Sequence, residues 1–234
     1  MNALARNPNE ALFLTAVERL APLLDEIAFV GGCATGLLIT DPGAAPVRPT
    51  LDVDAIVEIA SYAELVVLEE RLRKLGFQPA HREGAPICRW THEGLIFDLM
   101  PTDATILGFG NRWYRPALRN AGRMRIGDRE IRLITAPYFL ATKLEAFHGR
   151  GRRDYRMSHD LEDIVTVIDG RPEIVDEVLQ AEPLLLHHLS DTFSTLLADR
   201  DFVESLPGHL LPDAISQQRI TIVVNRIQQI AAGR

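Results

Sequence analysis

Apolar and polar positions in the first part of the chain alternate between helix-like and strand-like patterns. Asn7 and Pro8 form a helix-start signal, because a capping residue precedes a proline at the first helical position. The apolar residues that follow recur at helical spacing and predict an amphipathic opening helix. A short apolar run, residues 27–30, then ends in Gly31 and Gly32. This pattern predicts a strand that turns into a buried helix.

An acidic face marks the next predicted strand. Residues 51–56 alternate with the period of two of a strand, and Asp52 and Asp54 fall on the same face. The preceding stretch, residues 40–49, contains three prolines and is expected to be a loop.

A capping box and two hairpins complete the predicted first half. Ser61 and Glu64 have the spacing of a capping box, and the helix that they begin should stop at Gly76. Two hairpins are expected after it: residues 86–90 with 95–100, turning at Glu93-Gly94, and residues 124–126 with 131–134, turning at Gly127-Asp128.

The second half of the chain is helical almost throughout. Helices are predicted for residues 137–149, 158–169, 172–180, 182–199 and 212–232. The fold class is therefore α+β: a lobe with a mixed sheet, residues 1–134, followed by a helical bundle lobe, residues 135–234. We expect the functional site in the cleft between the two.

Composition and charge exclude several classes of protein. The 234 residues are 47% apolar and 24% charged, as in folded, soluble proteins. The net charge of 25 − 32 = −7 disfavours a surface coated uniformly for nucleic acid. The two cysteines, Cys33 and Cys88, are too few for a disulfide framework or a cysteine-rich zinc site. With no signal peptide and no long apolar segment, the expected location is the cytoplasm, away from membranes.

Three acidic residues and two glycines carry the chemistry. Residues two apart on a strand point to the same face and are roughly 6.6 Å apart along it, so the carboxylates of Asp52 and Asp54 could converge on one ion or bridge two. Asp98 lies in an apolar strand segment that could bring a third carboxylate. Such oxygen donors suit Mg²⁺, and two ions would activate an attacking hydroxyl and stabilise a leaving pyrophosphate. The backbone amides at Gly31 and Gly32 could bind a phosphate at a helix start. Singly, each feature is commonly a turn or a solvated edge; together they indicate nucleotidyl transfer, because unpaired buried charge is costly.

These residues resemble a known family. The segments 29–32 and 50–54, together with Asp98, are similar to the core signature of the DNA polymerase beta-like nucleotidyltransferase superfamily. Residues 142–147 and 158–164 resemble the later motifs of the AbiEii/AbiGii toxin family, so the resemblance covers roughly residues 27–169. It implies a nucleotidyltransferase lobe and a helical lobe, with Mg²⁺ as cofactor and an NTP as substrate. It also implies a toxin–antitoxin role with a cognate antitoxin, and tRNA as acceptor.

The resemblance assigns roles to the first lobe. Asp52 and Asp54 would bind both metal ions, and Asp98 would bind the catalytic ion and help to deprotonate the acceptor hydroxyl. Gly31 and Gly32 would cradle the phosphates. Two features depart from the family: Gly32 stands where a serine is common, and nineteen residues separate Gly32 from Asp52, with the proline-rich loop as the insertion.

The second lobe contributes further candidates. Lys143 is the expected triphosphate contact, and Arg150, seven residues later, is expected to point into the same cleft and bind the nucleotide. Asp160 and Asp163 could orient Lys143 or the nucleotide. Their alternative role is to stabilise the positive end of their own helix.

Two clusters of basic residues do not decide which molecule accepts the nucleotidyl group. Arginines around Trp113 and Tyr114, and again at 150–156, suit RNA phosphates and base stacking, or form solvated faces offset by nearby acids. One alternative function is nucleotidyl transfer to an antibiotic hydroxyl. A second is a HEPN-like ribonuclease, from the Arg153 and His159 spacing. A third is a nucleotide-binding module without turnover.

Overall fold

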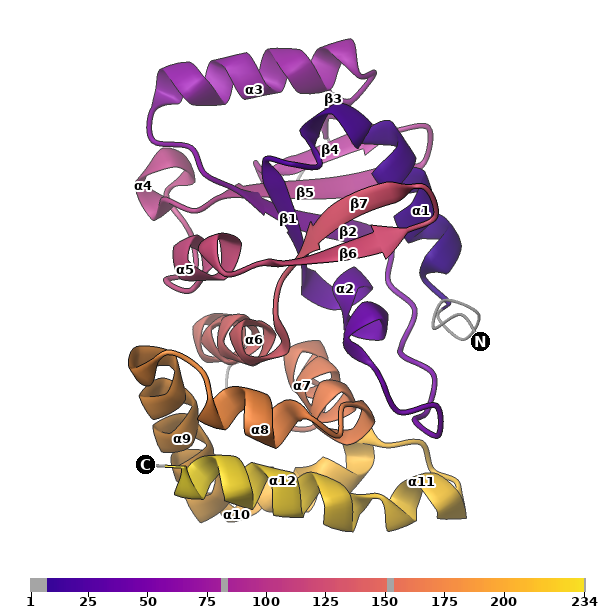
Figure 1. Ribbon diagram of the computed structural model, residues 1–234, viewed down its shortest axis with the longest axis vertical. Helices are drawn as coiled ribbons and strands as arrows, with labels where there is room; N and C mark the ends of the chain where they lie inside the picture. Colours follow the sequence, from indigo (N-terminus) through magenta and orange to yellow (C-terminus); the bar gives the residue numbers. More distant parts are fainter. Residues whose placement is uncertain (1–7, 81–83, 151–153, 234) are drawn as a thin grey trace. The chain divides into compact units, whose positions relative to one another are not determined.

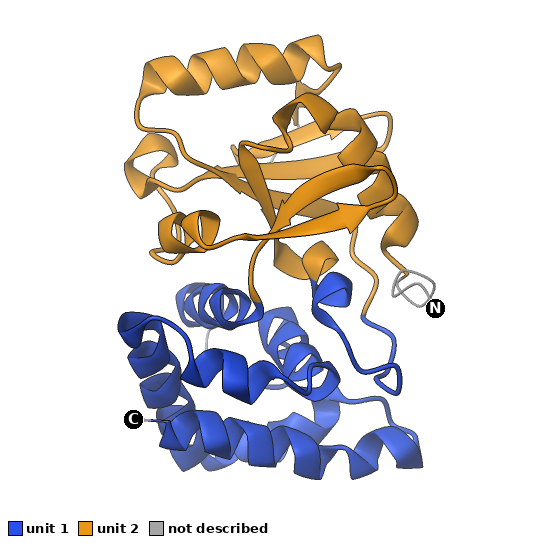
Figure 2. Cartoon of the chain, in the orientation of Figure 1, with its two compact units in different colours: residues 1–6, 35–47, 136–234 blue, residues 7–34, 48–135 orange. Residues whose placement is uncertain are grey.

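A computed structural model describes residues 8–80, 84–150 and 154–233, except the side chain of Arg150. The chain forms two compact units (Figure 2). Of the described residues, the sheet unit contains 8–34, 48–80 and 84–135, and the helical unit contains 35–47, 136–150 and 154–233. The chain therefore passes from one unit to the other more than once. The division into domains at residues 134 and 135 stays a prediction.

The sheet unit is built on one mixed sheet of seven strands (Figure 1). In spatial order the strands are β3 (Gln78–Pro79), β4 (Arg89–His92), β5 (Leu95–Pro101), β2 (Asp52–Val57), β1 (Ile27–Val30), β7 (Arg129–Leu133) and β6 (Gly122–Ile126). Strand β2 runs parallel to β5, and β1 runs parallel to β7. The other neighbours are antiparallel. Strand β2 thus lies at the centre of the sheet.

Buried apolar residues explain why these segments are strands and helices. All four residues of β1 are buried, as a central strand requires. Phe13 of α1 packs on Phe29 of β1, with ring centroids 4.8 Å apart. Helix α3 begins after Ser61, whose hydroxyl accepts a hydrogen bond from the Glu64 amide as the capping box predicts. The Glu64 carboxylate accepts its hydrogen bond from the Ala60 amide, one residue before the cap. The helices before residue 136 are α1 (Glu10–Arg19), α2 (Gly31–Leu38), α3 (Tyr62–Lys74), α4 (Ala104–Leu107) and α5 (Tyr114–Arg119). Helix α2 begins in the sheet unit and continues into the helical unit after Ala34.

The helical unit gathers the remaining helices (Figure 1). They are α6 (Ala136–Arg150), α7 (His159–Gly170), α8 (Ile174–Leu179), α9 (Pro183–Ala198), α10 (Arg200–Ser205), α11 (Ala214–Gln218) and α12 (Ile220–Ala232). Helix α7 has the expected apolar stripe, with Leu161, Ile164 and Ile168 all buried. Helices α9 and α12 pack together, and the Ser190 hydroxyl donates to the carbonyl of Ile230. No helix in the described part of the chain has the length and apolarity that crossing a membrane requires.

The proline-rich loop is anchored within the helical unit. The amides of Thr40 and Asp41 both donate to the carbonyl of Gly170. Arg219 donates to Asp41 at 2.6 Å and to both carboxylate oxygens of Asp169 at 2.8 and 2.9 Å. The first part of this loop is therefore fixed by backbone and charge-assisted hydrogen bonds.

Asp41→Asn should lower the free energy of unfolding by about 1–2 kcal/mol at pH 7, because it weakens a charge-assisted hydrogen bond. Hydrogen bonding from Arg219, and then from the Gly43 amide, lowers the pKa of Asp41 below its ordinary 3.8. The stabilisation is therefore fully present above that value and disappears as the pH falls through the lowered pKa. Urea unfolding of both proteins at pH 7 and near pH 3 measures this. Asp176→Asn, at an exposed position, is the control and should change the free energy of unfolding little at either pH. If Asp41→Asn lowered the free energy of unfolding equally at both pH values, the Asp41 carboxylate would not be the stabilising group.

The α+β fold class, with a mixed sheet followed by helices, is confirmed. The sequence analysis missed β3, α4, α5 and α10, all of which have seven residues or fewer and therefore show little periodicity. The single helix expected over 212–232 is wrong. The structure has two helices there, α11 and α12, separated at Arg219, whose side chain pairs with Asp41 and Asp169.

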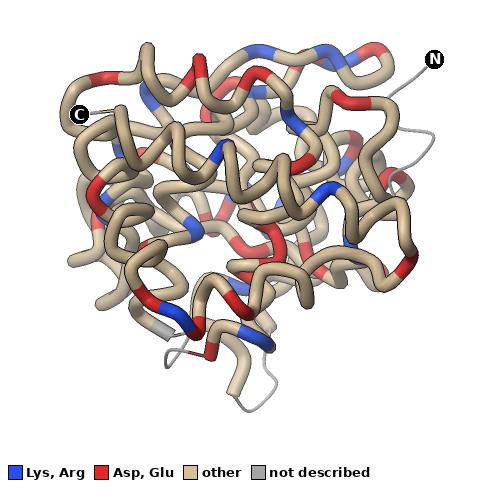
Figure 3. Tube along the Cα trace, turned by 90° about the horizontal axis from the view of Figure 1, so that it is seen from below, with Lys and Arg blue, Asp and Glu red and all other residues tan. Residues whose placement is uncertain are grey.

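Acidic and basic residues are interspersed along the chain (Figure 3).

Candidate active site

Strand pairing brings the three predicted aspartates together in the sheet unit. In the parallel pair β2 and β5, Asp54 lies directly opposite Asp98, and Asp52 lies two residues before Asp54. Side chains two apart on a strand, and side chains opposite each other on paired strands, point to the same face. Asp98 is buried, whereas Asp52 and Asp54 are half-buried. The arrangement places three carboxylates on one face of the central strands.

The turn after β1 lies against Asp54. Val30, the last residue of β1, pairs with Asp54, and Gly31 follows with a φ of +72°. A Cβ at Gly31 would lie 1.9 Å from the Oδ2 atom of Asp54. Only glycine therefore fits, both for its left-handed conformation and for its closeness to the carboxylate. Gly31 and Gly32 begin α2, so their amides belong to the first turn, which has no partner carbonyls within its own helix.

Arg89 is a site residue that the sequence analysis missed. It lies opposite Asp98 on β4, the neighbour of β5. Its Nε and Nη2 atoms donate to the two oxygens of Asp98 at 2.8 and 2.7 Å, and Nη2 also donates to Asp52 Oδ2 at 2.8 Å. Hydrogen bonding to Asp98 raises the pKa of Arg89, so the guanidinium stays charged.

The position of Arg89 opposite Asp98 could have been predicted from the hairpin turn. With Glu93-Gly94 as a two-residue turn, counting back along the strands pairs His92 with Leu95 and Arg89 with Asp98, and the structure has this register. Arg89 is thus a basic residue placed opposite a predicted acidic site residue.

The chemistry of the donor set fits a hard divalent cation. Three carboxylates on one face supply the oxygen ligands that Mg²⁺ prefers. Arg89 now neutralises Asp98 and Asp52, and within the described ranges no three acidic, histidine or cysteine side chains form a group that could hold a metal ion. Metal binding by Asp52, Asp54 and Asp98 stays a prediction, and it requires Arg89 to release two of them.

The two cysteines flank the acidic cluster as neutral thiols. Burial raises the pKa of Cys33 to about 12, with the charge of Asp54 adding to the effect. Burial likewise raises the pKa of Cys88 to about 12, with Asp98 adding to it. Both thiols are therefore protonated near neutral pH, which makes them poor metal ligands and poor nucleophiles.

A second charged cluster lies in the helical unit. The Nζ atom of Lys143 on α6 donates to Asp163 at 2.5 Å and to Asp160 at 3.3 Å, both on α7. The Lys143 side chain is 9% exposed and that of Asp163 is 1% exposed. The structure therefore brings Lys143 together with Asp160 and Asp163, the two residues considered as groups that orient it. One of the three Lys143 N–H donors has no hydrogen-bond partner among the described residues, and the proposed phosphate contact would use it.

Other candidates are less favourably placed. The side chain of Arg150, and all of Arg152 and Arg153, lie outside the described residues, so the Arg153–His159 pair has no described geometry. His159 is exposed and contacts Glu162 at 3.0 Å. The use of Trp113 as a base-stacking platform is wrong, because its side chain is 4% exposed and belongs to the core.

The basic cluster of the sheet unit is partly paired. Arg115 and Arg119 contact Glu58, and Arg123 contacts Glu130. Of the acids expected to offset these arginines, Glu130 does so, and Glu58 is a partner that the sequence did not indicate.

Comparisons with known proteins find similarity only at the level of solved structures. No family model matches the chain, and no curated protein matches it. The chain is similar to an antigenic nucleotidyltransferase-like protein from Paracoccidioides brasiliensis, with 20% identity and a TM-score of 0.49 over 83% of this chain and 91% of that one. It is similar to JHP933 from Helicobacter pylori, with 16% identity and a TM-score of 0.48 over 98% and 92%. It is also similar to the antibiotic-resistance factor ANT(2'')-Ia, with 13% identity and a TM-score of 0.45 over 80% and 96%. At these values the comparisons identify no activity or substrate for this chain.

Proposed function

We propose that this protein is a nucleotidyltransferase that moves an NMP group from an NTP to an acceptor hydroxyl. One observation carries the proposal: Asp54 lies opposite Asp98, with Asp52 on the same face, and the Asp54 carboxylate lies against the glycine turn that begins α2. Acidic oxygens and helix-start amides are the two groups that a metal-bound triphosphate requires.

Each residue has a role in the proposed reaction. Bound Mg²⁺, held by Asp52, Asp54 and Asp98, would supply charge neutralisation at the triphosphate and a lowered pKa for the acceptor hydroxyl. The amides of Gly31 and Gly32 donate to phosphate oxygens. The hydroxyl oxygen bonds to the α-phosphorus, the bond from that phosphorus to the β-phosphate oxygen breaks, and pyrophosphate leaves. The hydroxyl proton passes to a carboxylate oxygen of Asp98, which Arg89 must first release.

The residues of the helical unit complete the proposal. Lys143 donates its remaining N–H to the triphosphate, and Asp160 and Asp163 hold its ammonium group in place. Arg150 is proposed to bind the nucleotide from the end of the same helix.

The acceptor is proposed to be RNA, such as a tRNA 3′ end, in a cytoplasmic toxin–antitoxin pair with a cognate antitoxin. This part rests on the resemblance of residues 142–147 and 158–164 to the AbiEii/AbiGii motifs. The test incubates the protein with each α-labelled NTP and either total tRNA or an aminoglycoside and lincosamide panel. Label in RNA 3′ ends supports the proposal, label in a small molecule supports the antibiotic alternative, and RNA shortening without NTP supports a ribonuclease.

A second candidate function is NTP binding without transfer. The contacts of Arg89 favour it, because the guanidinium occupies both oxygens of Asp98 and one of Asp52. Calorimetric NTP binding, together with no label transfer to any acceptor, would favour this function over the enzyme.

Arg89→Gln should show whether the Arg89 guanidinium both stabilises the fold and competes with Mg²⁺ for the carboxylates. Without Mg²⁺, the variant should lose about 2–4 kcal/mol of unfolding free energy, because two carboxylates lose their partner. With millimolar Mg²⁺, its melting temperature should rise several degrees more than that of the unchanged protein, because the competing cation is gone. Thermal unfolding across a Mg²⁺ series measures both effects.

Arg129→Gln is the matched control, since Arg129 is exposed on another strand. If Mg²⁺ raised the melting temperature equally in the Arg89 variant, the control and the unchanged protein, Arg89 would not be competing with a metal.

A further inference from the structure

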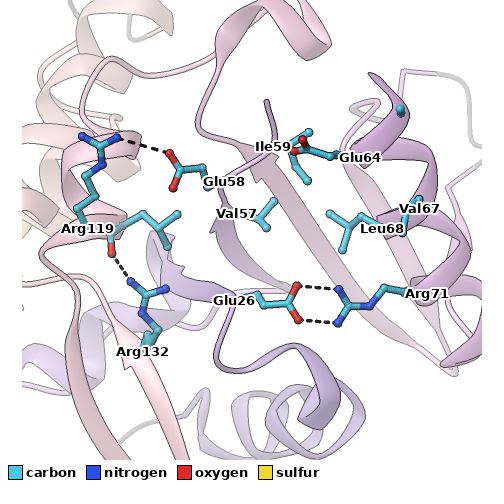
Figure 4. Close-up of a pocket in the computed structure, with 12 residues that line it drawn as sticks. Glu26, Val57, Glu58, Ile59, Glu64, Val67, Leu68, Arg71, Arg119 and Arg132 are labelled. Carbon is cyan, nitrogen blue, oxygen red and sulfur yellow. Dashed lines mark hydrogen bonds and ion pairs between the residues drawn. The ribbon is translucent and has the colours of Figure 1, made fainter. Parts of the chain in front are cut away.

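A pocket lies in the sheet unit, and none of the three aspartates lines it. Its volume is about 560 Å³, and residues of β2, α3, α5 and β7 line it (Figure 4). Val57, at its centre, follows Asp54 by three residues on β2, which places it roughly 10 Å further along the strand. A pocket of this size is large enough for a small organic ligand.

Two charged side chains of this pocket, Arg132 and Glu64, have no oppositely charged partner among the described residues. Arg71 is matched by Glu26, with two hydrogen bonds of 2.6 and 2.7 Å. Arg119 and Glu58 approach to 3.6 Å. Arg132 donates only to the backbone carbonyls of Asp25 and Leu118, and no carboxylate of the described residues lies within ion-pair distance of it. Its positive charge is therefore not cancelled locally.

The negative charge of Glu64 is likewise not cancelled, but it is held at the start of α3. The carboxylate of Glu64 accepts a hydrogen bond from the Ala60 amide, in the first turn of α3. Figure 4 shows Glu64 on the side of the pocket across from Arg132 and Arg119. The side formed by α5 and β7 is thus the one that attracts an anion.

The floor of the pocket is apolar. Val57 and Leu68 point into it (Figure 4), and Leu118 also lines it. Val67, also on α3, leaves 56% of its surface exposed at this pocket. Covering such apolar surface with a ligand is favourable at roughly 25 cal/mol per Å².

We propose that this pocket binds a small organic monoanion with a compact apolar body, such as an aromatic carboxylate. The carboxylate pairs with Arg132, with Arg119 beside it, and the ring packs on Val57, Leu68 and Val67. A guanidinium offers the parallel donors that a carboxylate matches, so the anionic group sets the orientation and the apolar floor supplies contact area. The proposal does not depend on the proposed nucleotidyl transfer.

Isothermal titration of the full chain with 1-naphthoate tests the proposal, with 1-naphthylmethylamine as the oppositely charged probe. Naphthoate should bind at least tenfold more tightly than the amine. Arg132→Gln should weaken naphthoate binding at least tenfold, whereas Arg129→Gln, which removes the same charge from an exposed position on the same strand, should leave it within twofold. Equal binding of the two probes, no binding of naphthoate, or unchanged binding by Arg132→Gln would each overturn the proposal.

A second pair of variants guards against a folding defect in Arg132→Gln. Val67→Asp places a carboxylate at the pocket and should weaken naphthoate binding at least tenfold. Val66→Asp places the same group on the neighbouring exposed position, which does not line the pocket, and should have little effect. Equal affinities in these two variants would place the ligand elsewhere.

Discussion

Asp54→Asn is expected to reduce NMP transfer by about a thousandfold or more, while the melting temperature stays within about 5 °C of the unchanged protein. Asparagine keeps the size of the side chain but removes the charge that the proposed metal site requires. The position is central, because Asp54 lies opposite Asp98 and against the turn at Gly31. Label transfer from an α-labelled NTP, measured beside thermal unfolding, tests the expectation.

The control is Asp128→Asn, which removes the same charge from an exposed hairpin turn. Its transfer rate should match that of the unchanged protein. Turnover that survives in Asp54→Asn would remove this residue from the metal site. Loss of the folded state in the same variant would show that the carboxylate is structural.

Gly31→Ala is expected to lower the free energy of unfolding by about 2–4 kcal/mol and to abolish NTP binding. Two effects combine: a left-handed conformation costs an alanine about 1–2 kcal/mol, and its Cβ would meet the Asp54 carboxylate. Since that Cβ would lie only 1.9 Å from a carboxylate oxygen, the carboxylate has to move, which also disturbs the acidic face. Urea unfolding and calorimetric NTP binding measure the two results.

Gly108→Ala isolates the backbone effect. Gly108 has a φ of +76°, close to the +72° of Gly31, but a Cβ there would have nothing within 4 Å. The Gly108→Ala variant should therefore lose only about 1–2 kcal/mol of unfolding free energy and should still bind NTP. Equal losses in the two variants would mean that the contact with Asp54 contributes nothing.

Local patterns were sufficient to predict the acidic face. Asp52 and Asp54 share a face because a strand repeats every two residues, and this needed no knowledge of the fold. Their place beside Asp98 required the pairing of β2 with β5, which no local pattern contains. The pairing of Arg89 with Asp98 could also have been predicted, because the hairpin turn fixes the register of the two strands. The sequence analysis did not count back along the strands and so missed it.

Contacts between distant segments explain what the sequence analysis could not predict. The loop after α2 was interpreted without a partner, because the residues that hold it, Gly170 and Arg219, come much later in the chain. Trp113 was considered for base stacking because it lies among arginines, and only the folded packing shows that it is buried. Short elements such as α4 and β3 are stabilised by neighbours rather than by their own periodicity.

The anchoring of the proline-rich loop also constrains the order of events during synthesis. Asp41 and its partner Arg219 are 178 residues apart, so the ribosome delivers the second long after the first. At typical translation speeds of about 5–20 residues per second, that interval lasts roughly 10 to 40 s. Throughout it the nascent loop has no Arg219 to bind. A stop codon placed just after the sheet segment would therefore yield a polypeptide whose loop never acquires its anchor.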